Sequence, residues 1–226
     1  MHMEPEVVTG AKVALGYATG TGAVAYAGNH AVQAVRREGL GSLALRSTLA
    51  TALVFCFFEV LSHHPVGVSE VHLILGTTLY LVFGLAPAAI GLALGLLVQG
   101  LFFAPFDLPQ YGMNVTTLLV PLFAVAVLAR RIVPAETPYV DLGYRQVLAL
   151  SIVYQGGIST WVAFWALYGG GFGAENLTAV AAFFAAYMLV IVLEPLVDLA
   201  VLALAKAAHG LKGSRLVQHR LHHGIS

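Results

Sequence analysis

The first two residues of the chain, Met1 and His2, can together form a metal chelate. Removal of an initiator methionine requires a small second residue, so the bulky His2 is expected to leave Met1 in place with a free amine. The amine nitrogen, the next backbone amide nitrogen and the His2 imidazole can then bind one metal in consecutive rings. Nitrogen donors in a plane favour Ni(II) or Cu(II), and Co(II) is also possible. The alternative is that His2 is an ordinary polar residue of a frayed terminus.

A second group of candidate ligands lies between two apolar runs and comprises His63, His64, Glu70 and His72. Histidines and acids at membrane depth are costly and usually functional. His72 opens an apolar run, where it could supply a fourth nitrogen, whereas His63 and His64 also suit an interfacial position. Glu70 could orient an imidazole through its other ring nitrogen or attract cations, and a solvated loop acid is the alternative.

The elements that must position these residues are membrane spans. Of the 226 residues, 59% are hydrophobic and 10% are charged, whereas a soluble domain carries about a quarter charged residues. This composition predicts a polytopic integral membrane protein surrounded by the lipid bilayer. The formal net charge is zero, so the chain has no overall basic field that could hold nucleic acid.

Seven apolar segments, separated by charged residues, Pro or Gly, each predict a transmembrane helix. They cover residues 11–35, 43–62, 71–84, 86–104, 113–129, 146–168 and 176–205. The third is short because Gly84 and Pro87 end it, so it could begin in the preceding loop, and a count of six remains open. We predict an all-α polytopic bundle of about seven transmembrane helices. It forms one domain over residues 1–226, with a metal-binding segment at 1–10, the bundle at 11–205 and a cytoplasmic tail at 206–226.

The basic residues predict the orientation of the bundle. All but one of the 11 Lys and Arg residues fall on one side of the seven-span arrangement, and Lys12 is the exception. The N-terminus is therefore expected outside and the C-terminus in the cytoplasm. All the candidate ligands then share the outer face. Asn114, Thr116 and Thr117 open the fifth segment at the same face and could support a metal site from behind its ligands.

Other polar and small residues have structural alternatives to a functional role. Glu59, Glu194 and Asp198 lie in or near spans, where they could relay ions in a secondary carrier or hold helices together. Small residues at a spacing of four predict flat helix stripes that pack within the bundle or dock another subunit. These stripes are Ala14, Ala18 and Gly22, and Gly91 with Gly95. The tail histidines, His209, His219, His222 and His223, are expected in a solvated or lipid-facing tail.

The sequence resembles the CbiM/NikM family, the cobalt and nickel substrate-capture (S) components of energy-coupling-factor transporters. The resemblance covers nearly the whole chain, including the extra N-terminal span. It rests on Met1-His2, on His72 followed by Gly76 and the apolar run to Phe83-Gly84, and on residues 111–117, Tyr-Gly-Met-Asn-Val-Thr-Thr.

The resemblance implies four nitrogen ligands for the metal. They are the Met1 amine, the amide of residue 2, the His2 imidazole and one further histidine. Counting back from Gly84 places that histidine at His72 rather than His64. The lower-ranked candidates at the same face are His64, Glu70 and Asn114.

The resemblance also implies the substrate and the partners. The transported ion would be Co(II) or Ni(II), and the membrane would be the bacterial or archaeal inner membrane. The partners would be a transmembrane scaffold (T) subunit, cytoplasmic ATPase subunits and a small accessory membrane subunit. The sequence departs from the family at Met3, Glu4 and Pro5, where members usually carry Ile at position 3 and a Gly soon after. This departure leaves the chelate intact but bears on which metal it holds.

The chain lacks the sequence features of an ATPase or a metalloenzyme. No Gly-rich phosphate loop with Lys and no Ser nucleophile elbow is present. No general base is evident beside a three-ligand open metal site. We therefore predict a transport component rather than an enzyme, with ATP hydrolysis in a separate subunit. The alternative is a stand-alone secondary transporter or channel for divalent cations.

Overall fold

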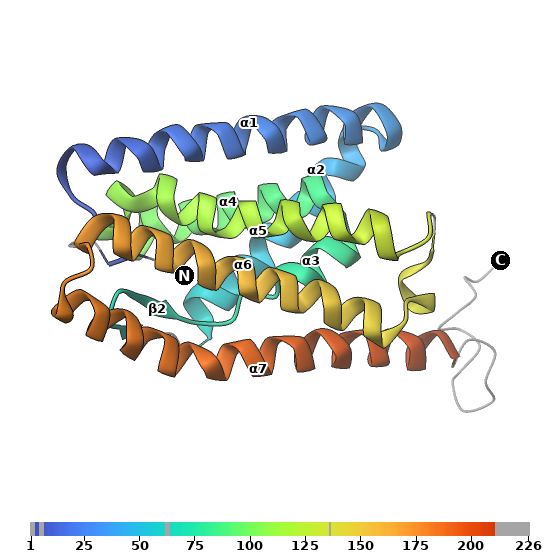
Figure 1. Cartoon of the computed structure of the whole chain (residues 1–226). Helices are drawn as coiled ribbons and strands as arrows, with labels where there is room; N and C mark the ends of the chain where they lie inside the picture. The colour runs from blue at the N-terminus through green and yellow to red at the C-terminus, as the bar shows by residue number, and fades with distance from the viewer. Residues whose placement is uncertain (1–2, 5–6, 62–63, 136, 211–226) are drawn as a thin grey trace.

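The computed structural model describes residues 3–4, 7–61, 64–135 and 137–210. Within them seven α-helices run roughly side by side as a bundle (Figure 1). The helices are α1 (Val13–Glu38), α2 (Leu40–Phe55), α3 (Gly76–Phe83), α4 (Leu85–Phe102), α5 (Tyr111–Ile132), α6 (Tyr144–Gly170) and α7 (Ala174–Gly210). A π-helical turn, Cys56–Val60, extends α2, and 3-10 turns cover Gly10–Lys12, Pro105–Gln110 and Tyr139–Asp141. The predicted helical bundle is confirmed, and α7 continues past the predicted boundary at residue 205.

Five of these helical segments are long and apolar enough to cross a membrane. They are α2 with its π turn, α4, α5 with the preceding 3-10 turn, α6 and α7. Helix α1 has 26 residues, which is enough for a span at about 1.5 Å per residue. It is less apolar than the others because Thr19, Thr21, Asn29 and His30 interrupt it.

The third apolar run forms a helix over only part of its length. Helix α3 has eight residues. The chain before it is an antiparallel hairpin of β1 (His64–Val66) and β2 (Ser69–Val71), which the sequence analysis did not predict. An irregular segment, residues 72–75, joins β2 to α3. The shortness of this run was visible in the sequence, but the hairpin was not, because its strands are three residues each.

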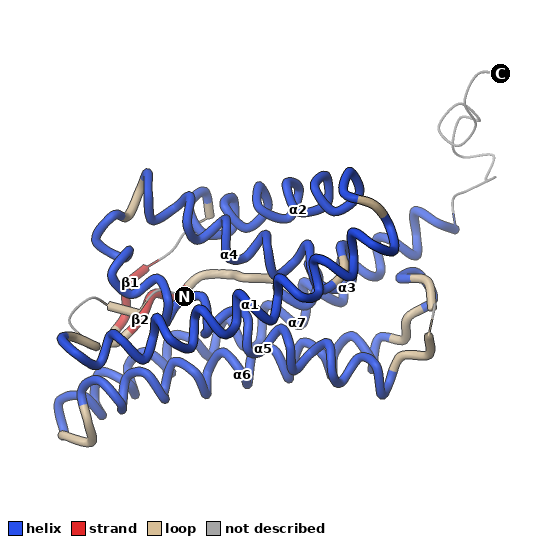
Figure 2. The backbone as a smooth tube through the Cα atoms, turned by 90° about the horizontal axis from the view of Figure 1, so that it is seen from above, coloured by secondary structure: helices blue, strands red, loops and turns tan. Residues whose placement is uncertain are grey.

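The bundle has two chemically different ends. We call one the hairpin end, where β1 and β2 lie beside the first residues of the chain (Figure 2). Lys12 binds the Gly169 carbonyl there, with Nζ 2.9 Å from the oxygen. At the other end, the basic end, Arg46 donates to the Phe83 carbonyl at 3.1 Å and Lys206 to the Val140 carbonyl at 2.7 Å. The connecting segments that carry these basic residues were predicted to share one face, and they lie at the same end of the bundle.

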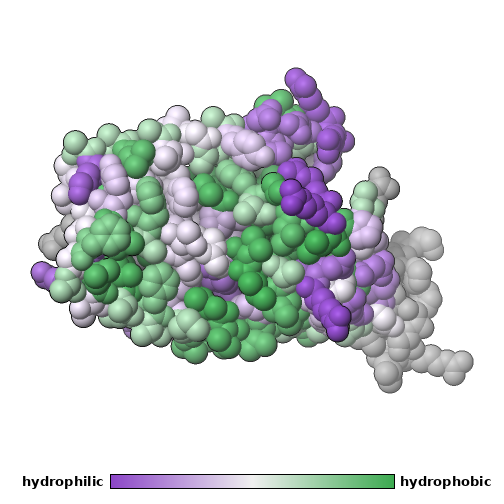
Figure 3. All heavy atoms as spheres, in the orientation of Figure 1, coloured by the Kyte–Doolittle hydropathy of each residue, from purple (hydrophilic) through white to green (hydrophobic). Residues whose placement is uncertain are grey.

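The flanks of the bundle are apolar, as a lipid-facing surface requires. Exposed large hydrophobic side chains include Leu45, Leu189 and Leu204. Apolar residues cover much of the flank in the space-filling view, and strongly hydrophilic residues gather mainly toward one end (Figure 3).

Small residues let neighbouring helices approach closely. A Cβ at Gly91 would lie 2.5 Å from the Ala50 Cβ, and a Cβ at Gly95 would lie 2.5 Å from a Val54 methyl group, so both glycines pack α4 against α2. The stripe of Ala14, Ala18 and Gly22 is instead exposed. The opposite face of α1, with Gly16, Gly20, Ala23 and Ala27, is the buried one. The prediction of packing within the bundle is thus right for α4 and wrong for the α1 stripe.

We expect Gly67→Ala to lower the melting temperature in detergent by roughly 4 °C or more. Gly67 turns the hairpin with φ +61°, and a Cβ there would lie 2.1 Å from the Ala179 carbonyl oxygen of α7. The matched control is Gly10→Ala, because Gly10 has φ +60° but open space around its Cβ position. Equal shifts for the two variants would show that hairpin docking on α7 contributes nothing.

Candidate metal centre

The beginning of the chain is fastened inside the hairpin end. The Met3 amide donates to Oδ1 of Asn114 at 2.8 Å, a contact that joins residues 111 positions apart. Met3 also forms an antiparallel bridge with Ser69 of β2, and the Glu4 amide donates to the Val68 carbonyl at 3.1 Å. The Met3 side chain is 1% exposed. These contacts extend the hairpin by a third backbone segment.

Val7 and Val8 are also held by contacts with the rest of the protein. Val8 is buried, and its carbonyl accepts a hydrogen bond from the Gln110 side chain at 3.5 Å. A Cβ at Gly169 would lie 2.0 Å from the Val7 carbonyl oxygen, so only glycine permits α6 to pass so close to this strand. Val8 therefore lies inside the protein, and the chain reaches the surface from Thr9 to Lys12 before α1 begins.

His72 lies inside the bundle, and one of its ring nitrogens contacts a backbone carbonyl. The residue is 2% exposed, and its ring lies 4.5 Å from the Phe58 ring, centroid to centroid. The His72 Nδ1 is 3.1 Å from the Leu73 carbonyl oxygen. A carbonyl only accepts, so Nδ1 carries the proton in this contact, and in the neutral imidazole Nε2 then has the lone pair. Nε2 is thus the nitrogen that can bind a metal.

The hairpin register separates His72 from His64. His64 pairs with Val71, so these two residues point to the same face of the ribbon. Side chains alternate along a strand, so the residue after Val71 points to the opposite face. Accordingly His64 is exposed and His72 is buried, and Glu70 is half-buried.

The sequence-predicted ligands are only partly within the described residues. Met1, His2 and His63 lie outside them. Among residues 3–4, 7–61, 64–135 and 137–210, no group of three or more His, Cys, Asp and Glu side chains could hold a metal ion.

Of the three polar residues at the start of α5, Asn114 is the one with a hydrogen bond to the described part of the N-terminal segment. Thr116 and Thr117 both donate to the Met113 carbonyl of their own helix, at 2.7 and 2.9 Å. All three side chains are buried. Sequence reasoning identified Asn114 as a supporting residue but could not identify the Met3 amide as the group it binds.

The two buried acids of α7 join helices. Glu194 is 0% exposed and Asp198 is 1% exposed. Glu194 accepts from the Ile74 amide through Oε1 and from the Gln155 side chain through Oε2, and Asp198 accepts from the Thr78 hydroxyl. These contacts favour the structural alternative over an ion relay. Glu59 lies half-buried in the π turn after α2, and no contact between described residues links it to either acid.

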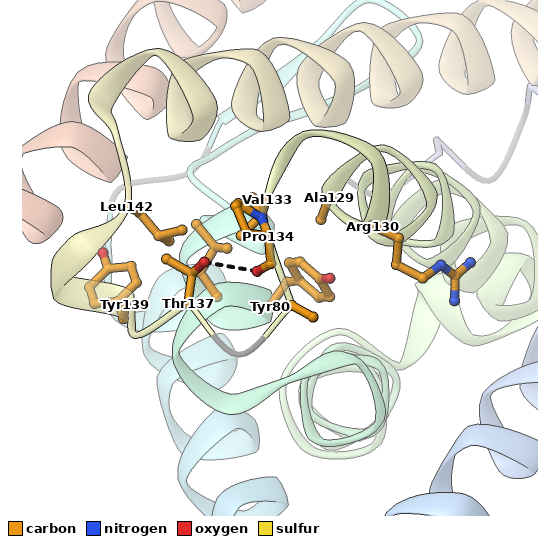
Figure 4. A pocket seen from close by; sticks show the side chains of 10 residues that line it. Tyr80, Ala129, Arg130, Val133, Pro134, Thr137, Tyr139 and Leu142 are labelled. Carbon is orange, nitrogen blue, oxygen red and sulfur yellow. Dashed lines mark hydrogen bonds between the residues drawn. The ribbon is translucent and has the colours of Figure 1, made fainter.

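A cavity of about 300 Å³ at the basic end does not suit a cation (Figure 4). Arg130 lies on its wall, and the hydrogen bond from the Thr137 hydroxyl to the Pro134 carbonyl closes one side at 2.8 Å. Burial, and then the Asp198 carboxylate, raise the pKa of the lining Tyr139 to about 12. The Tyr139 hydroxyl therefore stays protonated at neutral pH and is a poor metal ligand.

An open cavity of about 900 Å³ lies at the hairpin end. Its lining includes Glu4 of the N-terminal segment, Gly67 of the hairpin and Glu175 at the start of α7. The two carboxylates make this the cavity that a cation would prefer.

An apolar helical bundle of this kind defines a multi-pass membrane protein, and comparison with known proteins places it in a metal-transport class. The chain belongs to the CbiM family, described as the cobalt uptake substrate-specific transmembrane region, whose model matches residues 2–210. The resemblance found in the sequence is thereby confirmed. No curated protein sequence matches the chain.

Two solved structures share the fold. One is the crystal structure of a transition metal transporter, with a TM-score of 0.68 and 18% identity, covering 96% of each chain. The other is a truncated transition metal transporter with the same TM-score and identity, which covers 90% of this chain and 97% of its own.

Proposed function

We propose that this chain is the substrate-capture (S) component of an energy-coupling-factor importer for Co(II) or Ni(II) in a bacterial or archaeal inner membrane. The observation that carries the proposal is the anchoring of Met3 by Asn114 and Ser69 beside the buried His72. Membership of a cobalt-uptake family supports a transition metal as the substrate.

The proposed ligands are the Met1 amine, the amide and imidazole of His2, and Nε2 of His72. The Met3–Ser69 bridge is antiparallel, so moving back along the chain from Met3 follows the direction that leads from Ser69 to His72. Only two residues precede Met3, and two residues span at most about 7 Å. We propose that Met1 and His2 continue in this direction, toward His72.

The proposed energy source lies outside the chain. A nitrogen chelate that faces outside holds its metal tightly, so release inward requires work. The sequence has no phosphate-binding loop with which to hydrolyse ATP. The proposed partners are a transmembrane scaffold subunit, cytoplasmic ATPase subunits and a small accessory membrane subunit. The open cavity with Glu4 and Glu175 is the proposed approach for the cation.

The first prediction concerns the N-terminal amine. Adding one or two residues ahead of Met1 should abolish tight Ni(II) and Co(II) binding, because the amine would then lie outside the chelate rings. Isothermal titration of the purified protein measures the effect, and a C-terminal extension of equal length is the control. Normal binding by the N-terminally extended protein would contradict the chelate.

The second prediction separates the two described histidines of the hairpin region. His72→Ala should weaken metal binding by more than about 100-fold, since it removes a ligand rather than a supporting group. His64→Ala should change the dissociation constant by less than about threefold, because His64 is exposed on the other face of the ribbon. Titration of both variants decides the point, and equal losses would rule out this ligand set.

The third prediction concerns the energising partners. Uptake of radiolabelled cobalt and nickel into cells should require the scaffold and ATPase subunits together with this chain. Cells that carry this chain alone should bind metal at the surface without concentrating it. Concentrative uptake by the chain alone, lost on changing Glu194 or Asp198, would instead support the secondary transporter.

A further inference from the structure

One peptide group, between Leu73 and Ile74, is held from both sides. Its carbonyl oxygen, on Leu73, accepts from Nδ1 of His72 at 3.1 Å. Its N–H, on Ile74, donates to Oε1 of Glu194 in α7. The peptide is planar, so fixing the direction of the N–H also fixes the direction of the carbonyl. Glu194 therefore acts on the His72 ring through a single rigid unit.

Glu194 is itself held by a directional chain of hydrogen bonds. The Tyr187 hydroxyl donates to Oε1 of Gln155 at 2.6 Å, and Nε2 of Gln155 donates to Oε2 of Glu194. Tyr187 and Glu194 are 0% exposed, and Gln155 is 2% exposed. Both carboxylate oxygens accept, and both polar ends of the Gln155 amide are used. Such a network has one arrangement and no solvent to replace a lost member.

We propose that Glu194 is a positioning residue for the metal ligand His72, acting through the Leu73–Ile74 peptide. The inference rests on the proposed function, in which Nε2 of His72 binds the metal. A metal-binding histidine normally donates its other N–H to a carboxylate or a backbone carbonyl, which fixes the tautomer and the ring orientation. Here the carbonyl receives the N–H and the carboxylate holds the carbonyl, with Gln155 and Tyr187 as its support.

The orientation of Gln155 predicts which substitution the network tolerates. In Glu194→Gln, the remaining side-chain oxygen can still accept from the Ile74 amide. The new NH2 group, however, faces the NH2 group of Gln155, so two donors meet. If the Gln155 amide turns over, its oxygen accepts from the new group and its nitrogen donates to the Tyr187 oxygen. Glu194→Gln is thus rescued only when Tyr187 keeps its hydroxyl. Glu194→Leu cannot accept from Ile74 at all.

The experiment titrates Ni(II) into the purified full-length protein with its native N-terminus and records the visible absorption bands of the bound ion. We expect Glu194→Leu to weaken binding 10- to 100-fold and to shift these bands, because the His72 ring loses its fixed orientation. Glu194→Gln should bind within about threefold of the unmodified protein, and Glu194→Gln combined with Tyr187→Phe should again be weak.

Asp198→Leu is the matched control. Asp198 is a buried acid on the next turn of α7, but it accepts from the Thr78 side chain rather than from the peptide beside His72. If both acids had only a structural role, Glu194→Leu and Asp198→Leu would lower the melting temperature of the protein equally. Neither variant would then change the Ni(II) spectrum.

The outcomes separate this inference from the proposed function. If His72→Ala loses Ni(II) but Glu194→Leu binds with the original affinity and spectrum, the positioning role is wrong and the capture function stands. If His72→Ala binds normally, the proposed ligand set itself is wrong. If Glu194→Leu does not fold, Gln155→Leu replaces it, and an unchanged affinity and spectrum in that variant would overturn the inference.

Discussion

The structure depends on satisfying non-helical backbone inside a membrane bundle. Lipid offers no partner for an amide or a carbonyl, so irregular backbone at this depth must be buried against protein groups. Here β2, the segment that follows it and the strand at Met3 all need such partners. The backbone pairs at Met3 and Glu4, the Asn114 side chain and the Glu194 carboxylate supply them. Leu75, with φ 55°, then turns the chain into α3.

The same partners hold the hairpin end in place, where we propose that the metal binds. A chelate built on a free chain terminus would lose most of its binding energy to ordering that terminus. The Asn114 side chain anchors Met3, the residue that directly follows the proposed chelating pair. The remaining ligand, His72, is buried and has its tautomer set by the Leu73 carbonyl. Met3 and His72, which flank the proposed site, are thus both held by contacts within the protein.

The sequence predicts the parts of the structure that depend on local composition. Apolar runs and their charged ends predict the helices, because a span needs about 20 apolar residues whatever surrounds it. The early end of the third run at Gly84 is likewise visible, since Gly84 has φ +89° and separates α3 from α4. The sequence also places His72 at the start of an apolar run and His64 at an interfacial position, and the structure buries the first and exposes the second.

What the sequence does not predict are contacts between distant residues. Asn114 binds an amide 111 positions away, and Glu194 binds one 120 positions away. Neither contact leaves a periodic pattern in the sequence. A buried acid in an apolar helix looks the same in the sequence whether it moves ions or binds a backbone amide. The exposed stripe on α1 shows the same limit. Its spacing of four identifies a flat face, but only the neighbouring helices decide which flat face is covered.

The buried face of α1 fixes the position of this helix along the bundle. Gly20 and Gly112 lie so close that a Cβ on Gly20 would be 3.0 Å from the Gly112 backbone, and a Cβ on Gly112 would be 2.6 Å from the Gly16 carbonyl oxygen. Two helices that touch backbone to backbone cannot slide past one another without a clash. Asn114 follows Gly112 by two residues on α5, so this contact fixes α1, and the strand that precedes it, relative to the side chain that receives the Met3 amide. The glycines of α1 therefore help to set where α1 lies against α5, the helix whose Asn114 anchors Met3 at the proposed metal site.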